Sequence, residues 1–285
     1  MEKKMILSDN HVHTCFSSDS NTPVEDMLSH AKSLGLSSIC FTDHIDYGFP
    51  AEKYGIDFLF SMDEYFNKLK RLSAENHDFN IRIGVELGLK KDILPACLSL
   101  TKNYPFDFVI GSTHLVDNID PYYGEYWEGY GESRGIKHYY EATYDNIRQG
   151  FDFDVYGHID YVIRYCPAIK AAKAKSEIIE PHYDKMLKEN REILDEILLT
   201  LIQSGKGIEV NTGGLKYMLG HPNPHEEILC RYHALGGEIL SIGSDAHETK
   251  HLAFQFTKIP ALLQRCGFTH YTEFHKRKPV QQSIL

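Results

Sequence analysis

The histidines of this sequence are unevenly placed, since six of the sixteen follow short apolar runs that have the character of buried strands. In parallel α/β folds the C-terminal ends of the strands meet on one face, where the active site lies. Alternate residues of an extended segment point the same way, so a His-x-His or Asp-x-His spacing offers two ligands to one side. The six positions are His11, His13, His44, His114, His158 and His247.

Two acidic residues at matching positions, Glu86 and Asp245, extend this set into a candidate metal centre. Imidazole together with carboxylate suits zinc, manganese or iron, whereas calcium and magnesium prefer shells of oxygen alone. A lone His-x-His is more often a surface accident, but chance does not readily place the whole set at strand ends. The other ten histidines are expected to be structural or solvent-exposed: His30, His77, His138, His182, His221, His225, His233, His251, His270 and His275.

Apolar periodicity predicts the elements that must position these residues. The predicted strands are Met5–Leu7, Ser38–Thr42, Ile81–Leu87, Phe108–Ser112, Asp154–Gly157, Gly207–Val210 and Glu238–Ile242. The predicted helices are Val24–Leu34, Ser61–Glu75, Leu94–Lys102, Ile136–Gln149, Pro181–Gln203, His225–Leu235 and Thr249–Gln264.

Strand–helix alternation at this pitch predicts a parallel sheet with helical crossovers. There is no linker rich in proline, glycine or serine, so residues 1–285 are expected to form one domain, a barrel-like α/β closure. A doubly wound open sheet is the structural alternative. Residues 115–135 form a long polar and aromatic loop, and a loop of that length in a compact domain is usually functional or mobile.

Composition restricts the class of protein. The 285 residues carry forty acids against thirty bases, a formal charge of −10, which disfavours nucleic acid as a partner. No apolar run is long enough to cross a bilayer, and the start of the chain lacks an apolar stretch of signal-peptide length. Cysteines without CxxC spacing predict reduced thiols in a cytoplasmic protein: Cys15, Cys40, Cys97, Cys166, Cys230 and Cys266.

Six segments that contain the candidate ligands resemble the PHP family, which is named for polymerase and histidinol phosphatase. They occur in the family's order and extend over most of the chain: Asp9–His13, Phe41–His44, Gly84–Glu86, Gly111–His114, Gly157–Asp160 and Gly243–His247. The resemblance implies a distorted (β/α)7 barrel. It also implies three divalent transition-metal ions, zinc, manganese or iron, at the C-terminal ends of the strands.

Carried over position by position, the resemblance implies a ligand set for each ion. The first ion would be held by His11, His13, Glu86 and Asp245, the second by Glu86, His114 and His158, and the third by Asp19, His44 and His247. A carboxylate shared by two cations offsets their repulsion, and a water or hydroxide between them becomes a nucleophile at neutral pH. Glu86, Asp245 and His247 are expected to take part in catalysis as well as to bind metal.

Within the family the chain resembles most the histidinol-phosphate phosphatases, on the segments Gly157–Tyr161 with Arg164, Asn211–Lys216 and Phe274–Pro279. The activity implied is hydrolysis of L-histidinol phosphate, a small phosphomonoester, to histidinol and phosphate. Two other interpretations stay open. One is another PHP phosphoesterase, such as a protein-tyrosine phosphatase, a nucleotide phosphatase or a nuclease. The other is a non-catalytic PHP module that stabilises a larger assembly.

A phosphate ester also needs binding groups other than metals. Arg164 presents a guanidinium fork that suits phosphate oxygens, and Lys216 stands where related phosphatases are expected to have arginine, so it supplies charge without the fork. The alkoxide leaving group needs a metal or a general acid, for which Asp43, Asp160 and Asp245 are candidates. Acidic and aromatic residues of the 115–135 loop would receive the amine and imidazole of histidinol, or form a lid: Asp117, Asp120, Glu125, Glu128, Tyr122, Tyr123, Tyr126, Trp127 and Tyr130.

Overall fold

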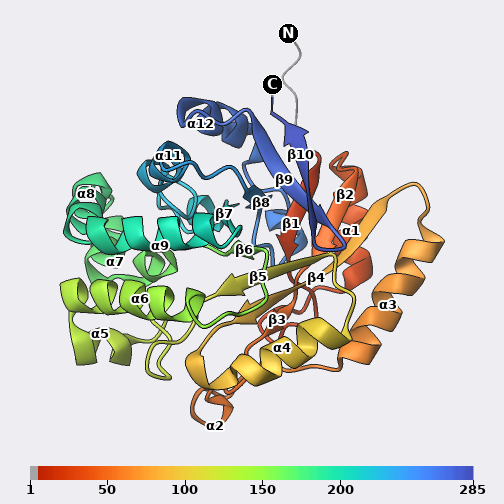
Figure 1. Cartoon of the computed structure of the whole chain (residues 1–285), viewed down its shortest axis with the longest axis horizontal. Coiled ribbons are helices and arrows are strands. Elements are labelled where there is room, and N and C mark those ends of the chain that lie inside the picture. Colours follow the sequence, from red (N-terminus) through yellow and green to blue (C-terminus); the bar gives the residue numbers. More distant parts are fainter. Residues whose placement is uncertain (1–5, 285) are drawn as a thin grey trace.

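A parallel sheet forms the centre of the molecule in the computed structural model, which describes residues 6–284 (Figure 1). The strand order is β1-β2-β4-β5-β6-β7-β8, and the short β3 pairs with β4. All neighbouring strands in this sheet are parallel. They are β1 (Ser8–Val12), β2 (Ser38–Phe41), β3 (His44–Ile45), β4 (Asn80–Gly88), β5 (Phe108–Ser112), β6 (Val155–Tyr156), β7 (Gly207–Asn211) and β8 (Leu240–Gly243).

The two outer strands, β1 and β8, meet and nearly close the sheet into a barrel. Val12 forms a parallel bridge with Ala246, and the amide of His13 donates to the carbonyl of Ala246 at 2.9 Å. The amide of Asp245 donates to the carbonyl of His11, also at 2.9 Å. The predicted distorted (β/α)7 barrel is therefore confirmed. An open doubly wound sheet is excluded, because its edge strands would lie far apart.

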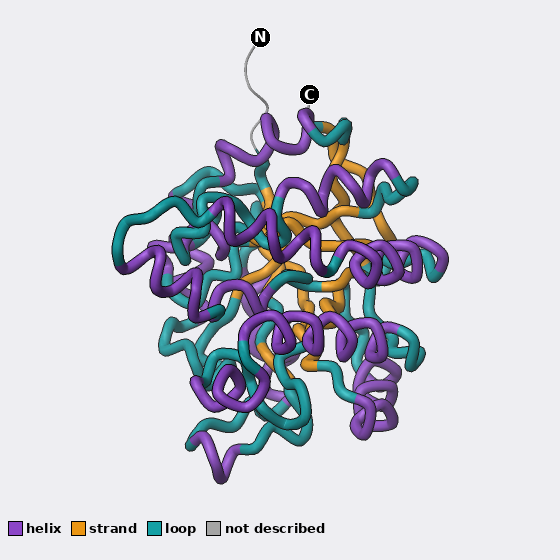
Figure 2. Tube along the Cα trace, turned by 90° about the vertical axis from the view of Figure 1, so that its left-hand side faces the viewer, coloured by secondary structure: helices purple, strands orange, loops and turns teal. Residues whose placement is uncertain are grey.

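Amphipathic helices cover the sheet, so that the strands lie inside a shell of helices (Figure 2). In α3, apolar residues from Met62 to Leu72 are buried at helical spacing, and the Ser61 hydroxyl caps the helix by accepting from the amide of Glu64. The helices are α1 (Val24–Ser33), α2 (Ala51–Tyr54), α3 (Met62–Glu75), α4 (Leu94–Asn103), α5 (Gly124–Tyr130), α6 (Glu132–Ile147), α7 (Pro167–Ala174), α8 (Glu180–Glu189), α9 (Arg191–Gln203), α10 (Gly213–Lys216), α11 (Glu226–Ala234) and α12 (Ile259–Arg265).

The structure divides two segments that were each expected to be one helix. Pro181–Gln203 forms α8 and α9, which are separated at the buried Asn190, whose side-chain amide donates to the carbonyl of Met186 at 2.8 Å and so caps α8. Residues 249–264 begin with two 3₁₀ turns and become α-helical only at Ile259. In both segments apolar spacing continues across the break, which periodicity alone does not reveal. Of the predicted first strand, Met5 lies outside the described residues, and β1 begins at Ser8.

Residues 115–135 are also more ordered than a long loop, because they contain α5. Tyr126 and Trp127 of this helix are buried. Their polar atoms are satisfied locally, since the Tyr126 hydroxyl donates to the carbonyl of Gly135 at 2.6 Å and the Trp127 indole to that of Pro121 at 2.8 Å. These two aromatic residues therefore anchor the segment to the core and leave only part of it to line a site.

A C-terminal hairpin covers the N-terminal ends of the strands, opposite the mouth that carries the candidate ligands. It consists of the antiparallel strands β9 (His270–His275) and β10 (Lys278–Ser283), which were not predicted. Phe274 is buried against Phe108 and Val155 at the starts of β5 and β6. Arg277 pairs with Asp152 and Asp154 just before β6. The hairpin thus closes the floor of the barrel.

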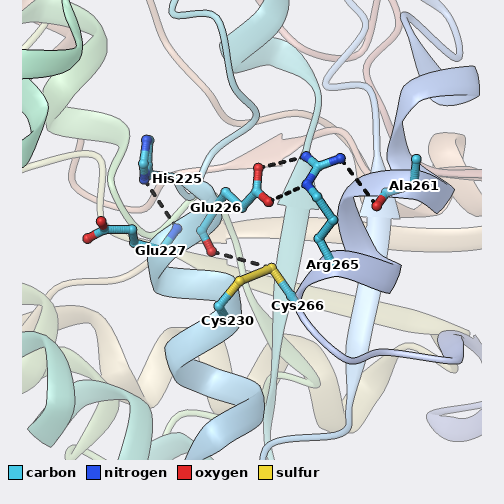
Figure 3. Close-up of a disulfide and its surroundings, with 7 residues drawn as sticks. All are labelled: His225, Glu226, Glu227, Cys230, Ala261, Arg265 and Cys266. Atoms are coloured by element: carbon cyan, nitrogen blue, oxygen red, sulfur yellow. Dashed lines mark hydrogen bonds and ion pairs between the residues drawn. A yellow bond between two sulfur atoms is a disulfide. The ribbon is translucent and has the colours of Figure 1, made fainter.

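The expectation of six reduced cysteines is wrong for two of them. Cys230 of α11 and Cys266, which follows α12, form a disulfide (Figure 3). The two helices are also joined by the ion pair between Glu226 and Arg265. Packing of segments 36 residues apart brings the thiols together, which spacing in the sequence does not reveal. The other four cysteines are free, as predicted. No helix within residues 6–284 is long and apolar enough to cross a membrane.

The floor of the barrel can be tested through Phe274. Phe274→Ala should lower the free energy of unfolding by about 3–4 kcal/mol, because a buried ring is lost from a closely packed site. Urea unfolding followed by fluorescence measures the change. The matched control is Val280→Ala in β10, which is 41% exposed and should cost less than about 0.5 kcal/mol. Equal effects of the two substitutions would contradict a hairpin that seals the barrel.

Candidate metal centre

All nine predicted metal ligands lie together at the C-terminal mouth of the barrel. Strand pairing places them there: His11 is on β1, His44 on β3 and Glu86 on β4, while His114, His158 and Asp245 follow β5, β6 and β8. His13, His247 and Asp19 stand in the loops after β1 and β8. Each of the histidines in this set lies within 4 Å of Glu86, Asp245 or both, and Asp19 joins them through His247.

The first group forms around one oxygen of Glu86. The Oε2 atom of this fully buried carboxylate lies 3.1 Å from His11 Nε2 and 3.4 Å from His13 Nε2. Asp245 Oδ1 lies 3.5 Å from His13 Nε2 and 3.9 Å from His11 Nε2. Four ligand atoms therefore surround one small space, as a tetrahedral or five-coordinate ion requires.

The second group forms around the other oxygen of Glu86. Oε1 lies 2.8 Å from His158 Nε2 and 3.3 Å from His114 Nε2. The hydroxyl of Ser112 also donates to Oε1, at 2.6 Å. One carboxylate thus presents its two oxygens to two different sets of imidazoles, which is the arrangement of a bridging ligand.

The third group lies nearest the solvent. Asp19 Oδ2 is 3.0 Å from His247 Nε2 and 3.8 Å from His44 Nε2. The ring of His13 stacks against both, with centroids 4.1 Å from His44 and 4.2 Å from His247. His13 therefore places the third candidate set against the first.

Hydrogen bonds fix which nitrogen faces the centre in three of the rings. His11 Nδ1 donates to Glu209 at 2.6 Å, and His114 Nδ1 donates to Asp46 at 2.7 Å. His247 Nδ1 donates to the carbonyl of Asp245 at 3.1 Å. The Nε2 atoms of these rings are therefore free to present lone pairs, the form in which histidine binds a metal.

His13 gives the clearest evidence that cations fit this centre. Its Nδ1 lies 3.1 Å from Ser17 Oγ, and that hydroxyl donates its own proton to Asp43 at 2.7 Å, so His13 Nδ1 must be the donor to Ser17. The Nε2 lone pairs of His11 and His13 then face each other across 2.9 Å beside an anionic carboxylate. Such a contact needs a positive charge among the three groups, which either a proton on His11 or a metal ion would supply. The donor set therefore fits a metal ion.

The charge states of Glu86 and His13 agree with this conclusion, whereas against the effect of burial the neighbouring carboxylates raise the pKa of His11 and of His114, so that a metal would displace a proton from these two rings. Burial would raise the pKa of Glu86, but the imidazoles of His11 and His44 hold that pKa well below its usual range. Burial and the neighbouring rings, His44 foremost, place the pKa of His13 well below its ordinary value. Glu86 is consequently ionised and His13 neutral near pH 7, and both are in the state that binds a metal.

Arg164 and Lys216 lie beside this centre. The guanidinium of Arg164 is 3% exposed, lies between the rings of Tyr161 and Tyr217, and donates to Asp245 Oδ2 at 3.0 Å. Lys216 Nζ donates to the carbonyl of Asp245 at 3.0 Å, and burial lowers the pKa of this amine. Both cations line the same cavity as the ligands, so the structure places them where an anionic group of a substrate would meet the metals.

The cavity above the centre has a volume of about 650 Å³. Its wall is largely aromatic, and its acidic residues other than the predicted ligands are Asp46, Asp120 and Glu248. Of the three carboxylates considered as a general acid, only Asp245 lines it. Asp43 and Asp160 are fully buried outside the cavity. Neither is therefore in position to protonate a leaving group.

Comparison with known proteins identifies the fold family. The PHP domain family matches residues 9–213. The chain belongs to the PHP domain family. A histidinol-phosphatase of Lactococcus lactis is 32% identical over 277 residues, with 95% of each chain covered. A probable histidinol-phosphatase of Thermotoga maritima is 28% identical over 268 residues, with 93% of this chain and 94% of the relative covered.

Two solved structures share the fold of this chain. The crystal structure of histidinol phosphate phosphatase from Lactococcus lactis, in complex with zinc, L-histidinol and phosphate, has a TM-score of 0.83 and 30% identity. It matches over 97% of this chain and 100% of its own. A putative histidinol phosphatase from Listeria monocytogenes has a TM-score of 0.73 at 19% identity, which supports the fold alone.

Glu209 was not among the predicted site residues, although in this PHP protein it contacts two of the predicted ligands. It is on β7 and is 1% exposed; its Oε1 accepts from His11, and its Oε2 accepts from the amide of His158 at 3.0 Å. With Glu86, it raises the pKa of His11 well above the usual value against the opposing effect of burial. The available signal was a carboxylate within a short apolar strand, Gly207–Asn211, two residues before its end.

The bridging position of Glu86 leads to a direct test. Glu86→Ala should lower the metal content at two sites and reduce kcat by more than about 100-fold, beyond what loss of an outer hydrogen-bonding partner costs. Mass spectrometry of the purified protein measures the metals, and circular dichroism checks the fold. Glu128→Ala, at an exposed acid, is the control. Full metal content with near-normal turnover would remove the bridging role.

Proposed function

We propose that this protein is a metal-dependent phosphomonoesterase that hydrolyses L-histidinol phosphate to histidinol and phosphate, a reaction of histidine biosynthesis. The observation that carries the proposal is Glu86, whose two oxygens face different imidazole sets beside a cavity lined by Arg164 and Lys216. The Lactococcus relative, whose structure holds zinc, L-histidinol and phosphate, supports the same substrate. A cytoplasmic location accords with a biosynthetic role.

The metal complement is part of the proposal. Three divalent transition ions, zinc, manganese or iron, would be held by the three groups described above, with Glu86 shared between the first and second. When bound, they would activate water for attack and stabilise the charge that develops on the phosphoryl group. His11, His13 and His114 would contribute by keeping their Nε2 lone pairs directed at the centre.

The residues around the centre would bind and orient the ester. Arg164 would direct its N–H groups at phosphate oxygens, and Lys216 would add a positive charge in the same cavity. The aromatic wall would exclude water around the leaving group and pack against the imidazole ring of histidinol. In this arrangement the phosphate would lie beside the candidate ligands and the amino alcohol would extend along the aromatic wall.

Asp120 is the residue best placed to recognise the amine of histidinol. It is 9% exposed and lines the cavity, and the Tyr122 amide and Tyr161 hydroxyl both donate to its Oδ1, at 2.8 and 3.1 Å. Its Oδ2 accepts a hydrogen bond from no group within residues 6–284. A primary ammonium group would satisfy that oxygen and the negative charge. Two of the other acids expected in this role form ion pairs instead and do not line the cavity: Asp117 pairs with His138, and Glu125 pairs with Lys53.

A rate comparison across phosphomonoesters tests the proposed activity. The protein should be purified with its native metals and assayed with histidinol phosphate, phosphotyrosine, a nucleoside monophosphate and glycerol phosphate. We expect the highest kcat/KM for histidinol phosphate. Faster turnover of phosphotyrosine or the nucleotide would reassign the substrate. No turnover by metal-loaded protein would favour a non-catalytic module.

Asp120→Asn tests the amine contact. It should raise KM for histidinol phosphate about ten-fold or more, because a charge-assisted contact is lost, and leave KM for glycerol phosphate nearly unchanged. Glu128→Gln removes an exposed acid of the same segment and should alter neither value. Steady-state kinetics with both esters provides the measurement. A similar rise in KM for both esters would count against recognition of the amine by Asp120.

A further inference from the structure

The guanidinium of Arg164 is held by two asparagine side chains as well as by Asp245. Its Nε donates to Asn223 Oδ1 at 2.7 Å and its Nη2 donates to Asn211 Oδ1 at 3.0 Å, while Nη1 donates to Asp245 Oδ2 at 3.0 Å. A guanidinium has five N–H groups. One N–H on each terminal nitrogen is therefore left without a partner among the described residues and is available to a phosphate group.

Asn223 can serve Arg164 in only one orientation of its amide. Its Nδ2 donates to Asp160 Oδ1 at 2.6 Å. Because a carboxylate only accepts and a guanidinium only donates, the amide must direct its nitrogen at Asp160 and its oxygen at Arg164. Asp160 thus determines that an acceptor faces the arginine.

Asp160 is itself held by hydrogen bonds and does not line the cavity. It is fully buried, and its Oδ2 accepts from the Tyr183 hydroxyl and, at 3.0 Å, from the backbone amide of His225. The backbone of Asn223 is fixed as well, since its N–H and C=O pair with those of Asn211 at 2.8 and 2.7 Å. The chain Asp160–Asn223–Arg164 therefore has a firm anchor at each step.

Asn211 is oriented in the same way by Glu209, which accepts from Asn211 Nδ2 at 3.1 Å. Glu209, however, also accepts from His11, one of the predicted metal ligands. No hydrogen bond within residues 6–284 joins the side chains of Asp160 or Asn223 to any of the nine predicted ligands. The Asp160–Asn223 pair can therefore be altered without a direct effect on metal binding, whereas Glu209 cannot.

We propose that Asp160 and Asn223 are positioning residues that hold Arg164 in the geometry for a phosphate group. This inference rests on the proposed phosphatase activity. Without the Asn223 oxygen, the guanidinium would be free to rotate about its contact with Asp245, to which Nη1 already donates, and so withdraw N–H groups from the substrate. A fixed fork also loses less conformational freedom when a phosphate binds.

The pair allows a test by exchange of its two side chains. Asp160→Asn brings two donating amides together, and Asn223→Asp brings two carboxylates together. The double variant restores every hydrogen bond: the amide introduced at position 160 would accept from Tyr183 and His225 and donate to the carboxylate introduced at position 223, which would accept from Arg164. We expect each single variant to raise Ki for inorganic phosphate and KM for histidinol phosphate about ten-fold or more, with metal content unchanged. The double variant should recover most of both values.

Two further variants separate positioning from general destabilisation. Asn223→Ala removes the amide without placing two donors or two carboxylates together. It should raise Ki for phosphate even if Asp160→Asn or Asn223→Asp fails to fold. Asn146→Ala removes another buried amide of the barrel, which donates to Leu89 and Thr113; it should lower Tm and leave Ki unchanged. A folded, metal-loaded Asn223→Ala protein with the parental Ki would overturn the proposal, as would a double variant that regains Tm but not Ki.

Arg164→Lys distinguishes failure of this inference from failure of the proposed function. If Arg164→Lys raises Ki for phosphate and the variants of Asp160 and Asn223 do not, only the positioning role is wrong. If Arg164→Lys leaves Ki unchanged, the phosphate-binding role of Arg164 itself is wrong, and the positioning proposal is overturned with it.

Discussion

The structure depends on one carboxylate, Glu86, buried among imidazoles at the mouth of the barrel. Neither of its oxygens reaches solvent, and each faces imidazole nitrogens. A buried anion is strongly unfavourable by itself, and protons or metal ions shared between the carboxylate and the imidazoles offset that cost. The same feature that makes the centre costly without metal therefore gives it affinity for metal.

The contacts that close the barrel also bring predicted metal ligands together. The backbone contacts that join β1 to β8 involve His11, His13 and Asp245, three of the predicted ligands. Glu209 on β7 holds His11 on β1 and the amide of His158 after β6, and so spans three strands. Misplacement of one strand would disturb several ligands together, which accounts for a site that is rigid although its residues are far apart in the chain.

The sequence predicted the strands and ligands that follow a local periodic pattern. It did not predict the contacts that depend on how distant segments pack. Strand ends such as Asp9–His13 and Gly243–His247 combine an apolar run with ligand types, so position and chemistry both followed from local pattern. No local pattern of this kind surrounds Glu209. Its role arises only in the folded sheet, where β7 lies between β6 and β8, and β8 in turn meets β1. The Cys230–Cys266 pair and the break at Asn190 likewise depend on how helices pack, which a local pattern does not contain.

Two buried carboxylates outside the ligand set divide the task of organising the site. Glu209 orients His11 and Asn211, whereas Asp160 orients Asn223 alone, and both asparagines direct their oxygens at Arg164. An amide between an acid and an arginine transmits orientation without adding net charge near the metals. Asp245 already contacts the guanidinium directly, at 3.0 Å, whereas Asp160 and Glu209 act on it only through an amide. The interposed asparagines thus hold Arg164 in place without bringing further carboxylates against it.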